Sequence, residues 1–392
     1  MAAVPKLSRR SRWMVPAGVV AAVAAVGIAS AITVAQAAPA LPPRTPAQLL
    51  AAVAGPGHVP PLTGTVVETA SLGIPQLPGS EDPTSITSLL AGSHTLKVWY
   101  DGSQRVRLAV PDTMSETDFI RNGTTAWLWQ SNSDSVTKIL LPKYRGGERE
   151  PVMPRAPLTP QQAAKQVLAA VGPSTRVTTE ANVTVAGKAA YQLVLAPKSS
   201  ASLIGKITIA LDAQHLTVPL RVQVFAKRAA TPAFQVSYTS ISFVTPAASN
   251  FDFAPPPGAR VRTVRADRPA GGYRSAPVPG QQGMHSGVRI IGQDWTSVAV
   301  LPEAALSEVA GRGNVAGVAG QAARSVSGGG GQVSGSAVLG ALLAAAHPVH
   351  GAWGSGRLLH TSLVSMLITS NGHVLIGAVT PSVLYAAAAQ VK

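Results

Sequence analysis

The chain has 392 residues, of which 46% are hydrophobic and only 12% are charged, and it contains no cysteine. The hydrophobic share is sufficient for a folded core, and the lack of cysteine excludes disulfide frameworks, thiolate metal sites and a cysteine nucleophile. The net charge of +15 is spread along the sequence. This argues against nucleic-acid binding, because nucleic-acid-binding proteins usually gather their basic residues on one face. A basic protein outside the cytoplasm would instead be drawn to anionic lipids or wall polymers.

The N-terminal segment has the pattern of an export signal. A basic stretch, residues 6–12, precedes an uncharged apolar stretch, residues 13–35, and the small residues Ala35 and Ala37 form an A-x-A cleavage pattern. Residues 1–38 are therefore predicted to be a signal peptide or, because the apolar stretch is also long enough to cross a bilayer, an N-terminal membrane anchor. Both alternatives place the rest of the chain outside the cytoplasm, where ATP- and NAD-dependent chemistry is not expected.

Residues 39–255 are dominated by short segments in which polar and apolar residues alternate, which is the period of a half-buried β-strand. Two helices are predicted between them, one beginning at Pro46 after the N-cap Thr45 and one at Pro160 after Thr159. Because strands and helices do not alternate regularly, an antiparallel meander is expected. The predicted strands are residues 62–71, 95–100, 105–110, 118–121, 125–130, 136–140, 176–180, 183–185, 190–195, 206–211, 220–225 and 234–243.

The remainder of the chain is predicted to contain a linker and a small C-terminal β-rich domain. Residues 256–288 are rich in Pro, Gly and Arg and lack periodicity, which is typical of a flexible linker. Residues 289–392 form the predicted C-terminal domain, with a disordered Gly-rich insert over residues 311–340. Its predicted elements are strands at residues 295–301, 358–369 and 373–380, a hairpin turn at Asn371-Gly372 and a helix from Pro381.

Candidate metal and catalytic groups are incomplete. His347 and His350 lack a nearby third ligand and are separated by Pro348. Ser355 and His360 could form a nucleophile and a base, but Ser355 is not in a G-x-S-x-G motif because Trp353 precedes it by two positions; a tight structural turn is the favoured interpretation of this segment. The glycines at 311 and 313 do not complete a dinucleotide fingerprint, and most acidic residues lie in predicted turns. We therefore expect no enzymatic activity, no cofactor and no metal.

Three segments resemble motifs of one known superfamily. Residues 119–129 (FIRNGTTAWLW) resemble the strand pair with a DG-x-x-x-W motif in LolA-like lipoprotein carriers and the related RseB (MucB)-like envelope sensors. Residues 251–258 (FDFAPPPG) resemble the F-x-F-x-P-P-x-G ending of the same superfamily, and residues 206–222 are similar to its central hairpin. The resemblance covers about residues 45–260. It implies a mainly β, half-open antiparallel β-barrel with a helical lid around an apolar cavity that holds acyl chains.

One departure from this resemblance concerns lipoprotein transfer. The carriers often have a basic residue followed by Pro-Asn after the strand that here ends at Trp99, whereas this chain has the sequence YDGSQR at residues 100–105. The arginine role of the carriers therefore does not transfer to this sequence.

The apolar positions of the predicted strands are the candidate wall of the cavity. A strand that lines a cavity needs apolar side chains at every second position, although an ordinary packed core has the same pattern. For Trp127 and Trp129 the cavity wall is favoured, because large amphipathic rings suit a partly open site. The candidate cavity residues are Trp99, Trp127, Trp129, Tyr191, Leu193, Ile207, Ile209, Val222, Val224, Phe234 and Val236.

The sequence leaves two functions open. The first is a non-enzymatic extracytoplasmic binding protein that carries or sorts a lipid, an acylated molecule or a lipoprotein. The alternative is an RseB-like envelope-stress sensor that binds a membrane-bound anti-sigma factor, because residues 292–302 and the hairpin at Asn371-Gly372 resemble the small second domain of those sensors. The expected partners are acyl chains and a membrane-bound regulator or transporter, and nucleic acid is not among them.

Overall fold

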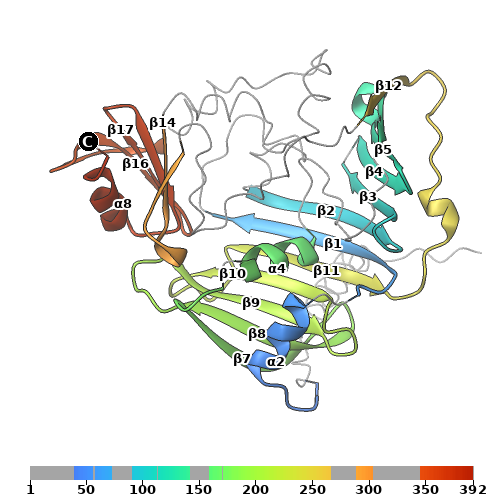
Figure 1. Cartoon of the computed structure of the whole chain (residues 1–392), viewed down its shortest axis with the longest axis horizontal. Helices are drawn as coiled ribbons and strands as arrows, with labels where there is room; N and C mark the ends of the chain where they lie inside the picture. Colours follow the sequence, from blue (N-terminus) through green and yellow to red (C-terminus); the bar gives the residue numbers. More distant parts are fainter. Residues whose placement is uncertain are drawn as a thin grey trace, which may run out of the picture. The chain divides into compact units, whose positions relative to one another are not determined.

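The computed structural model of this chain is mainly β (Figure 1). It describes residues 39–55, 58–72, 91–112, 114–141, 159–169, 171–265, 288–302 and 345–391. The described part contains a twelve-stranded sheet, a separate six-stranded sheet and three short α-helices. The predicted export signal with Ala35 and Ala37, most of the predicted linker and the Gly-rich insert lie outside the described residues.

The large sheet has the strand order β12-β6-β5-β4-β3-β2-β1-β11-β10-β9-β8-β7. Its pairs are antiparallel except for β12, which runs parallel to β6. Within the described residues β12 and β7 stay unpaired edges, so the sheet does not close and the predicted half-open barrel is confirmed. The strands are β1 (Leu62–Ser71), β2 (Ala91–Tyr100), β3 (Arg105–Pro111), β4 (Glu116–Asn122), β5 (Thr125–Gln130), β6 (Ser135–Leu140), β7 (Thr175–Val185), β8 (Lys188–Pro197), β9 (Ile204–Asp212), β10 (Pro219–Ala226), β11 (Phe234–Ser242) and β12 (Arg260–Arg265).

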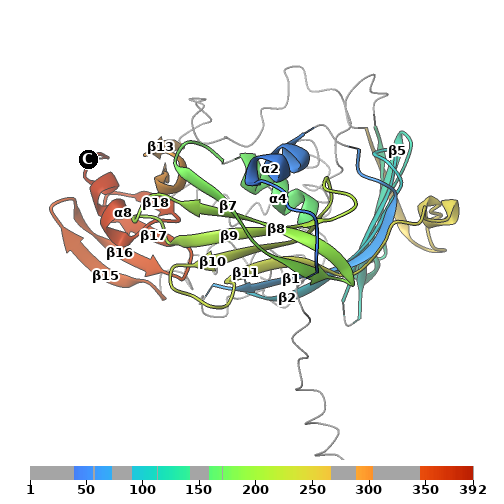
Figure 2. The ribbon, with the colours of Figure 1, turned by 90° about the horizontal axis from the view of Figure 1, so that it is seen from below.

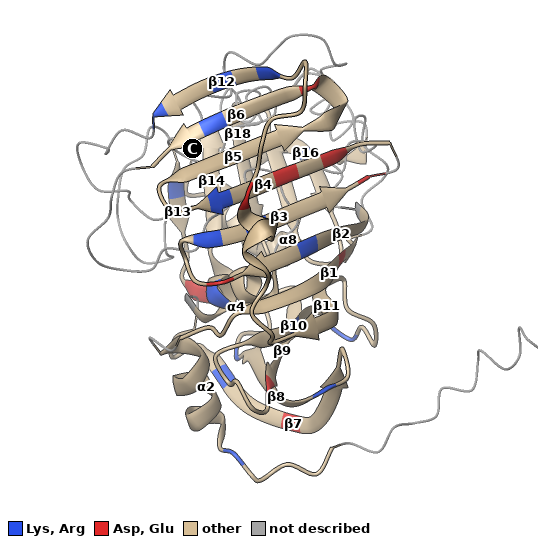
Figure 3. Cartoon of the chain, turned by 90° about the vertical axis from the view of Figure 1, so that its right-hand side faces the viewer, with Lys and Arg blue, Asp and Glu red and all other residues tan. Residues whose placement is uncertain are grey.

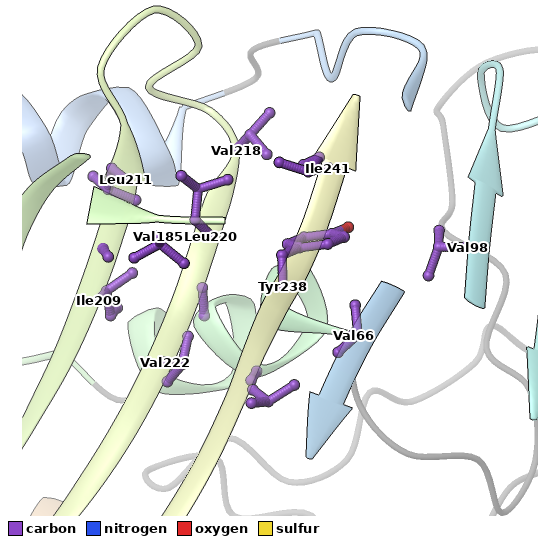
Figure 4. Packing of buried hydrophobic residues seen from close by; sticks show 14 of the residues in the cluster. Val66, Val98, Val185, Ile209, Leu211, Val218, Leu220, Val222, Tyr238 and Ile241 are labelled. Carbon is purple, nitrogen blue, oxygen red and sulfur yellow. The ribbon is translucent and has the colours of Figure 1, made fainter. Parts of the chain in front are cut away.

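One face of this sheet, called the core face below, carries the main hydrophobic core. Every second residue of β1 from Leu62 to Ala70 is buried on this face, Gly64 and Glu68 included, and the residues between them point away from it. The register extends the core face to both neighbouring strands, because Val66 lies opposite Leu96 of β2 and Tyr238 of β11. Figure 4 shows how side chains from β1, β2, β9, β10 and β11 converge there. The opposite side is called the outer face.

Two short helices pack on the core face over β7–β11 (Figure 1). The first, α2 (Pro46–Ala54), begins in a capping box in which Thr45 and Gln48 exchange side-chain to backbone hydrogen bonds of 3.0 and 3.2 Å. The second, α4 (Pro160–Ala169), begins with the same reciprocal pair between Thr159 and Gln162. Both predicted helix starts are confirmed. The helix α2 packs on β7 and β8, and α4 packs on β10 and β11.

The small sheet has the order β13-β14-β18-β17-β16-β15, and α8 (Pro381–Ala388) packs on β17 and β18 (Figure 2). Trp353 lies in the turn between β15 and β16, is 8% exposed and stacks on Tyr385 with 5.5 Å between ring centroids. The tight turn predicted at residues 353–357 is therefore present only at its start, because residues 354–357 belong to β16. The strands are β13 (Arg289–Ile291), β14 (Val298–Pro302), β15 (His347–Gly351), β16 (Gly354–His360), β17 (Ser365–Thr369) and β18 (His373–Gly377).

Four predicted elements differ from the structure. The strand predicted at residues 295–301 begins only at Val298, because Asp294–Thr296 form a 3-10 helix. Residues 358–369 are not one strand, because residues 361–364 separate β16 from β17. The segment 176–185 is one strand, β7, with an irregular register between Glu180 and Val183. Residues Arg260–Arg265 form β12 although a linker was predicted there; the strand is held by its pairing with β6 and by the Arg260 guanidinium, which donates a 2.7 Å hydrogen bond to the Ser133 carbonyl.

The capping box of α2 gives a stability test. Replacing Thr45 with Ala removes the acceptor for the Gln48 amide, and the free energy of unfolding should fall by about 1 kcal/mol. Thr45→Ser keeps the hydroxyl and should stay within a few tenths of the parent. Denaturant unfolding of both variants makes the measurement, and equal stability of the two would show that the cap does not contribute.

Candidate functional site

Eight of the candidate cavity residues come together on the core face of β8–β11. Leu193 lies opposite Ile209, Ile209 opposite Val222, and Val222 opposite Val236. Among these eight, Val224 and Phe234 are partly buried and the rest are at most 6% exposed. Figure 4 shows Ile209 and Val222 side by side. The eight residues are Tyr191, Leu193, Ile207, Ile209, Val222, Val224, Phe234 and Val236.

The two helices fill the space over this part of the core face. Leu49 of α2 is fully buried, and Ala163 and Ala164 of α4 belong to the same hydrophobic cluster as the strand residues. The Tyr191 hydroxyl donates a 2.9 Å hydrogen bond to the Pro42 carbonyl, which fastens the segment before α2 to β8. A ligand that reaches these strands therefore has to displace a helix.

The core face continues beyond the helices onto β2–β5. Val98 lies opposite Leu108, Leu108 opposite Phe119, and Phe119 opposite Leu128. The first three are at most 8% exposed. Since α2 and α4 pack on β7, β8, β10 and β11, this apolar area lies to the side of both helices. The sequence analysis did not select these residues, although their alternation with polar neighbours on β2 and β3 could have identified them.

Trp99, Trp127 and Trp129 lie on the outer face, which corrects the expectation that they share one wall with the other eight. Trp99 lies opposite Arg107, and Trp127 lies opposite both Ile120 and Lys138, all at positions that alternate with core-face residues. On β5 the core-face positions are Ala126 and Leu128. Because side chains alternate along a strand, Trp127 and Trp129 point to the outer face.

Cations and an aromatic ring accompany these tryptophans. The Arg107 guanidinium carbon is 5.1 Å from the Trp99 ring centroid, and the Lys138 ammonium is 5.1 Å from that of Trp127. The Phe253 ring lies 5.5 Å from the Trp127 ring. Partly buried aromatic rings at these positions are therefore explained by contacts on the outer face.

Phe253 belongs to a strap, defined as residues 247–258, which crosses the outer face of β3 and β4 between β11 and β12 (Figure 3). The strap contains the 3-10 helix η3 (Ala248–Phe251), whose Phe251 is 1% exposed. The Asn122 amide nitrogen donates a 3.2 Å hydrogen bond to a carboxylate oxygen of Asp252. The F-x-F segment that suggested the superfamily thus fastens the strap to the sheet.

A buried ion pair lies beside this strap. Asp118 is 3% exposed and accepts a 2.5 Å hydrogen bond from Arg107, while its second carboxylate oxygen has no hydrogen-bond partner. Burial raises the pKa of Asp118 to about 6; the Arg107 guanidinium lowers it in part, and the neighbouring Glu116 raises it.

The candidate metal and catalytic groups do not assemble. His347 and His350 are three positions apart on β15, which places them on opposite faces of the strand. The Ser355 hydroxyl donates to Ser370, whereas His360 lies 2.8 Å from the hydroxyl of Ser365. In the described part of the chain, no group of three or more His, Cys, Asp or Glu residues is placed to hold a metal ion. No helix among the described residues has the length and apolar character needed to span a membrane.

The Asp118 carboxyl predicts a pH dependence of stability. Its folded pKa, about 6, lies above its ordinary value of 3.8, so the folded protein binds this proton more tightly than the unfolded chain does. Its stabilising contribution is complete below pH 3.8 and is lost as the pH rises through 6. Relative to Asp118→Asn, the parent should lose up to about 3 kcal/mol between pH 4 and pH 7. Urea unfolding across this range measures the difference, and a gain with rising pH would mean that the Arg107 pair lowers the pKa instead.

Among known proteins, the chain is similar to solved structures. No protein-family model and no curated protein matches the chain. The structure of the Pseudomonas aeruginosa MucA/MucB complex is 13% identical with a TM-score of 0.38, covering 87% of this chain and 94% of that chain. An uncharacterized conserved protein from Thermus thermophilus is 10% identical with a TM-score of 0.31, covering 56% of this chain and 99% of that chain.

A LolA superfamily protein from Nitrosomonas europaea is 8% identical with a TM-score of 0.22, covering 54% of this chain and 99% of that chain. At these TM-scores the fold is assigned from the order, pairing and open edges of the sheet itself.

Proposed function

We propose that the protein is a non-enzymatic binding protein that acts outside the cytoplasm and holds acyl chains, from a lipid, an acylated molecule or a lipoprotein, against its core face. One observation carries the proposal: the apolar core face runs from β8–β11 across β1 to β2–β5, while among the described elements α2 packs on β7 and β8 and α4 on β10 and β11. The ligand site is then the core face of β2–β5 together with the candidate residues that α4 covers.

The energetics of such a site suit a long apolar ligand. Each methylene group removed from water contributes about 0.8 kcal/mol, so a chain of a dozen carbons gains on the order of 10 kcal/mol without a polar contact. Part of this gain is spent on opening the packing, because the side chains concerned are buried in the unliganded protein.

The decisive experiment compares truncations on the two faces of neighbouring strands. Phe119 of β4 points to the core face, and Trp127 of β5 points to the outer face. Phe119→Ala should weaken binding of a fluorescent fatty acid about five- to tenfold, because the ligand loses an apolar contact surface. Trp127→Ala is the matched control and should change affinity less than twofold.

Native mass spectrometry of the purified protein gives the second measurement. A co-purified lipid is the expected result. No co-purified lipid together with no uptake of the fluorescent fatty acid would overturn the proposal, and so would a larger loss of affinity in Trp127→Ala than in Phe119→Ala when both variants remain folded.

A second function, that of an RseB-like sensor, is favoured by a separate observation: hydrogen bonds join the small sheet to the large sheet. The backbone of Leu203, before β9, donates a 2.8 Å hydrogen bond to Ala378, and Thr380 donates one of 2.9 Å to Ala201. The Trp295 indole donates a 2.7 Å hydrogen bond to the Thr175 hydroxyl of β7. We propose that this link would transmit a change at the core face to a partner on the small sheet.

The sensor is tested by pull-down from detergent-solubilised membranes with and without added fatty acid. The expected result is recovery of one single-span membrane protein, in an amount that the fatty acid changes. Recovery of no such protein, or recovery that the fatty acid leaves unchanged, would count against the sensor and would leave the binding protein as the proposed function.

A further inference from the structure

The outer face of the large sheet has a hollow of its own, with a cavity volume of about 260 Å³. It lies over β11, β1 and β2, on the side of the sheet away from the hydrophobic core. Its outward-pointing lining combines one aromatic ring, one cation and four hydroxyl groups. These residues define the Trp99 hollow: Thr63, Thr65, Lys97, Trp99, Ser240 and Ser242.

The strand register arranges this lining in two parallel rows. In one row Thr63 lies between Trp99 and Ser242, and in the next Thr65 lies between Lys97 and Ser240. Directly opposite residues on paired strands have their Cβ atoms about 5 Å apart, so the six side chains form a compact array. The position is set by the β1–β11 pairing, which has its bulge between Thr65 and Val66.

The polar groups of this array are available to a ligand. The hydroxyls of Thr63, Thr65 and Ser240 make no hydrogen bond to another described residue, and the hydroxyl of Ser242 accepts a hydrogen bond of 3.4 Å from the Val244 amide. Lys97 and Ser240 are exposed. A ligand in the hollow would therefore meet hydroxyl donors and acceptors without displacing a contact inside the protein.

The Trp99 ring is held in place by Arg107, which is itself paired with Asp118. The Arg107 guanidinium lies over the Trp99 ring at 5.1 Å, and Arg107 is in turn held by the buried carboxylate of Asp118 at 2.5 Å. Trp99 is thus positioned before a ligand arrives, which lowers the entropic cost of binding.

We propose that the Trp99 hollow binds an acidic carbohydrate. A sugar ring offers an apolar face to an aromatic side chain and hydroxyl groups to neighbouring donors and acceptors, which matches Trp99 beside two rows of Thr and Ser. Lys97 lies opposite Thr65 at the rim and supplies a cation for a carboxylate on the sugar. The net charge of +15 favours the approach of an anionic polymer. This site is separate from the acyl site and does not depend on it.

The test titrates the full chain with a hexamer of galacturonic acid, with maltohexaose as a neutral control and inorganic phosphate as a free anion. Calorimetry measures affinity, and tryptophan fluorescence reports contact with the ring. The acidic hexamer should bind, maltohexaose should bind about tenfold more weakly, and phosphate should not compete. Binding of the acidic hexamer should weaken as the salt concentration rises.

Three variants test whether the acidic hexamer binds in the Trp99 hollow. Trp99→Ala should weaken binding of the acidic hexamer at least about tenfold. Lys97→Gln, an exposed substitution that leaves the fold intact, should weaken it about fivefold and reduce its salt dependence. Trp127→Ala removes another cation-paired tryptophan of the same face and should have less than a twofold effect.

Several results would overturn the inference. They are no binding of the acidic hexamer, equal binding of maltohexaose, full competition by phosphate, or unchanged affinity in Lys97→Gln. Should Trp99→Ala fail to fold, Lys97→Gln and its salt dependence still decide the matter. Fatty-acid binding measured on the same preparations separates this result from the acyl-binding proposal, because Lys97→Gln should leave it unchanged.

Discussion

The antiparallel pairing of β1 with β11 is the constraint on which the rest of the molecule depends. The strands β2–β6 follow β1 as one meander, and β7–β11 form a second meander; among the described strands, the β1–β11 pair alone joins them into a single sheet. Its register decides which residues of both meanders share the core face. A shift by one residue would exchange the core face and the outer face of one half.

Much of the fold follows from local sequence patterns. The alternation over Leu62–Ser71 and Thr125–Gln130 predicts β1 and β5 with their observed ends, and the capping pairs at Thr45 and Thr159 locate both helix starts. The missed strands lie where a partner supplies the stability. In the segment Arg260–Arg265 the apolar residues Val261 and Val264 are three positions apart and do not share a face, so the local pattern does not predict a strand; its pairing with β6 makes it one. Likewise β15, with its His-Pro start, is an edge strand held by β16.

The candidate site was predictable where one face of a strand is clearly apolar. On β9, Ile207, Ile209 and Leu211 alternate with smaller or polar residues, and the predicted orientation of the first two agrees with the register. On β5 both faces carry apolar residues, since Ala126 and Leu128 alternate with Trp127 and Trp129. The register with β4 and β6 places the two tryptophans on the outer face, where Phe253 of the strap meets Trp127 from a position far along the chain. A contact between residues so far apart in the sequence cannot be predicted from the local pattern of polar and apolar residues.

The strap also fixes an order of assembly. The bond between Asn122 and Asp252 joins residues 130 positions apart, and closing so long a loop is slow unless the intervening chain is already compact. The strap therefore fastens a sheet that has already formed, since it lies across β3 and β4 and leads into β12 beside β6. In a protein that emerges from its N-terminus, β2–β6 can pair before residue 252 is present, whereas β12 can pair with β6 only afterwards. Release of the strap would expose Phe251 and the outer face of β3 and β4 to water, and would leave β12 attached to the large sheet through β6.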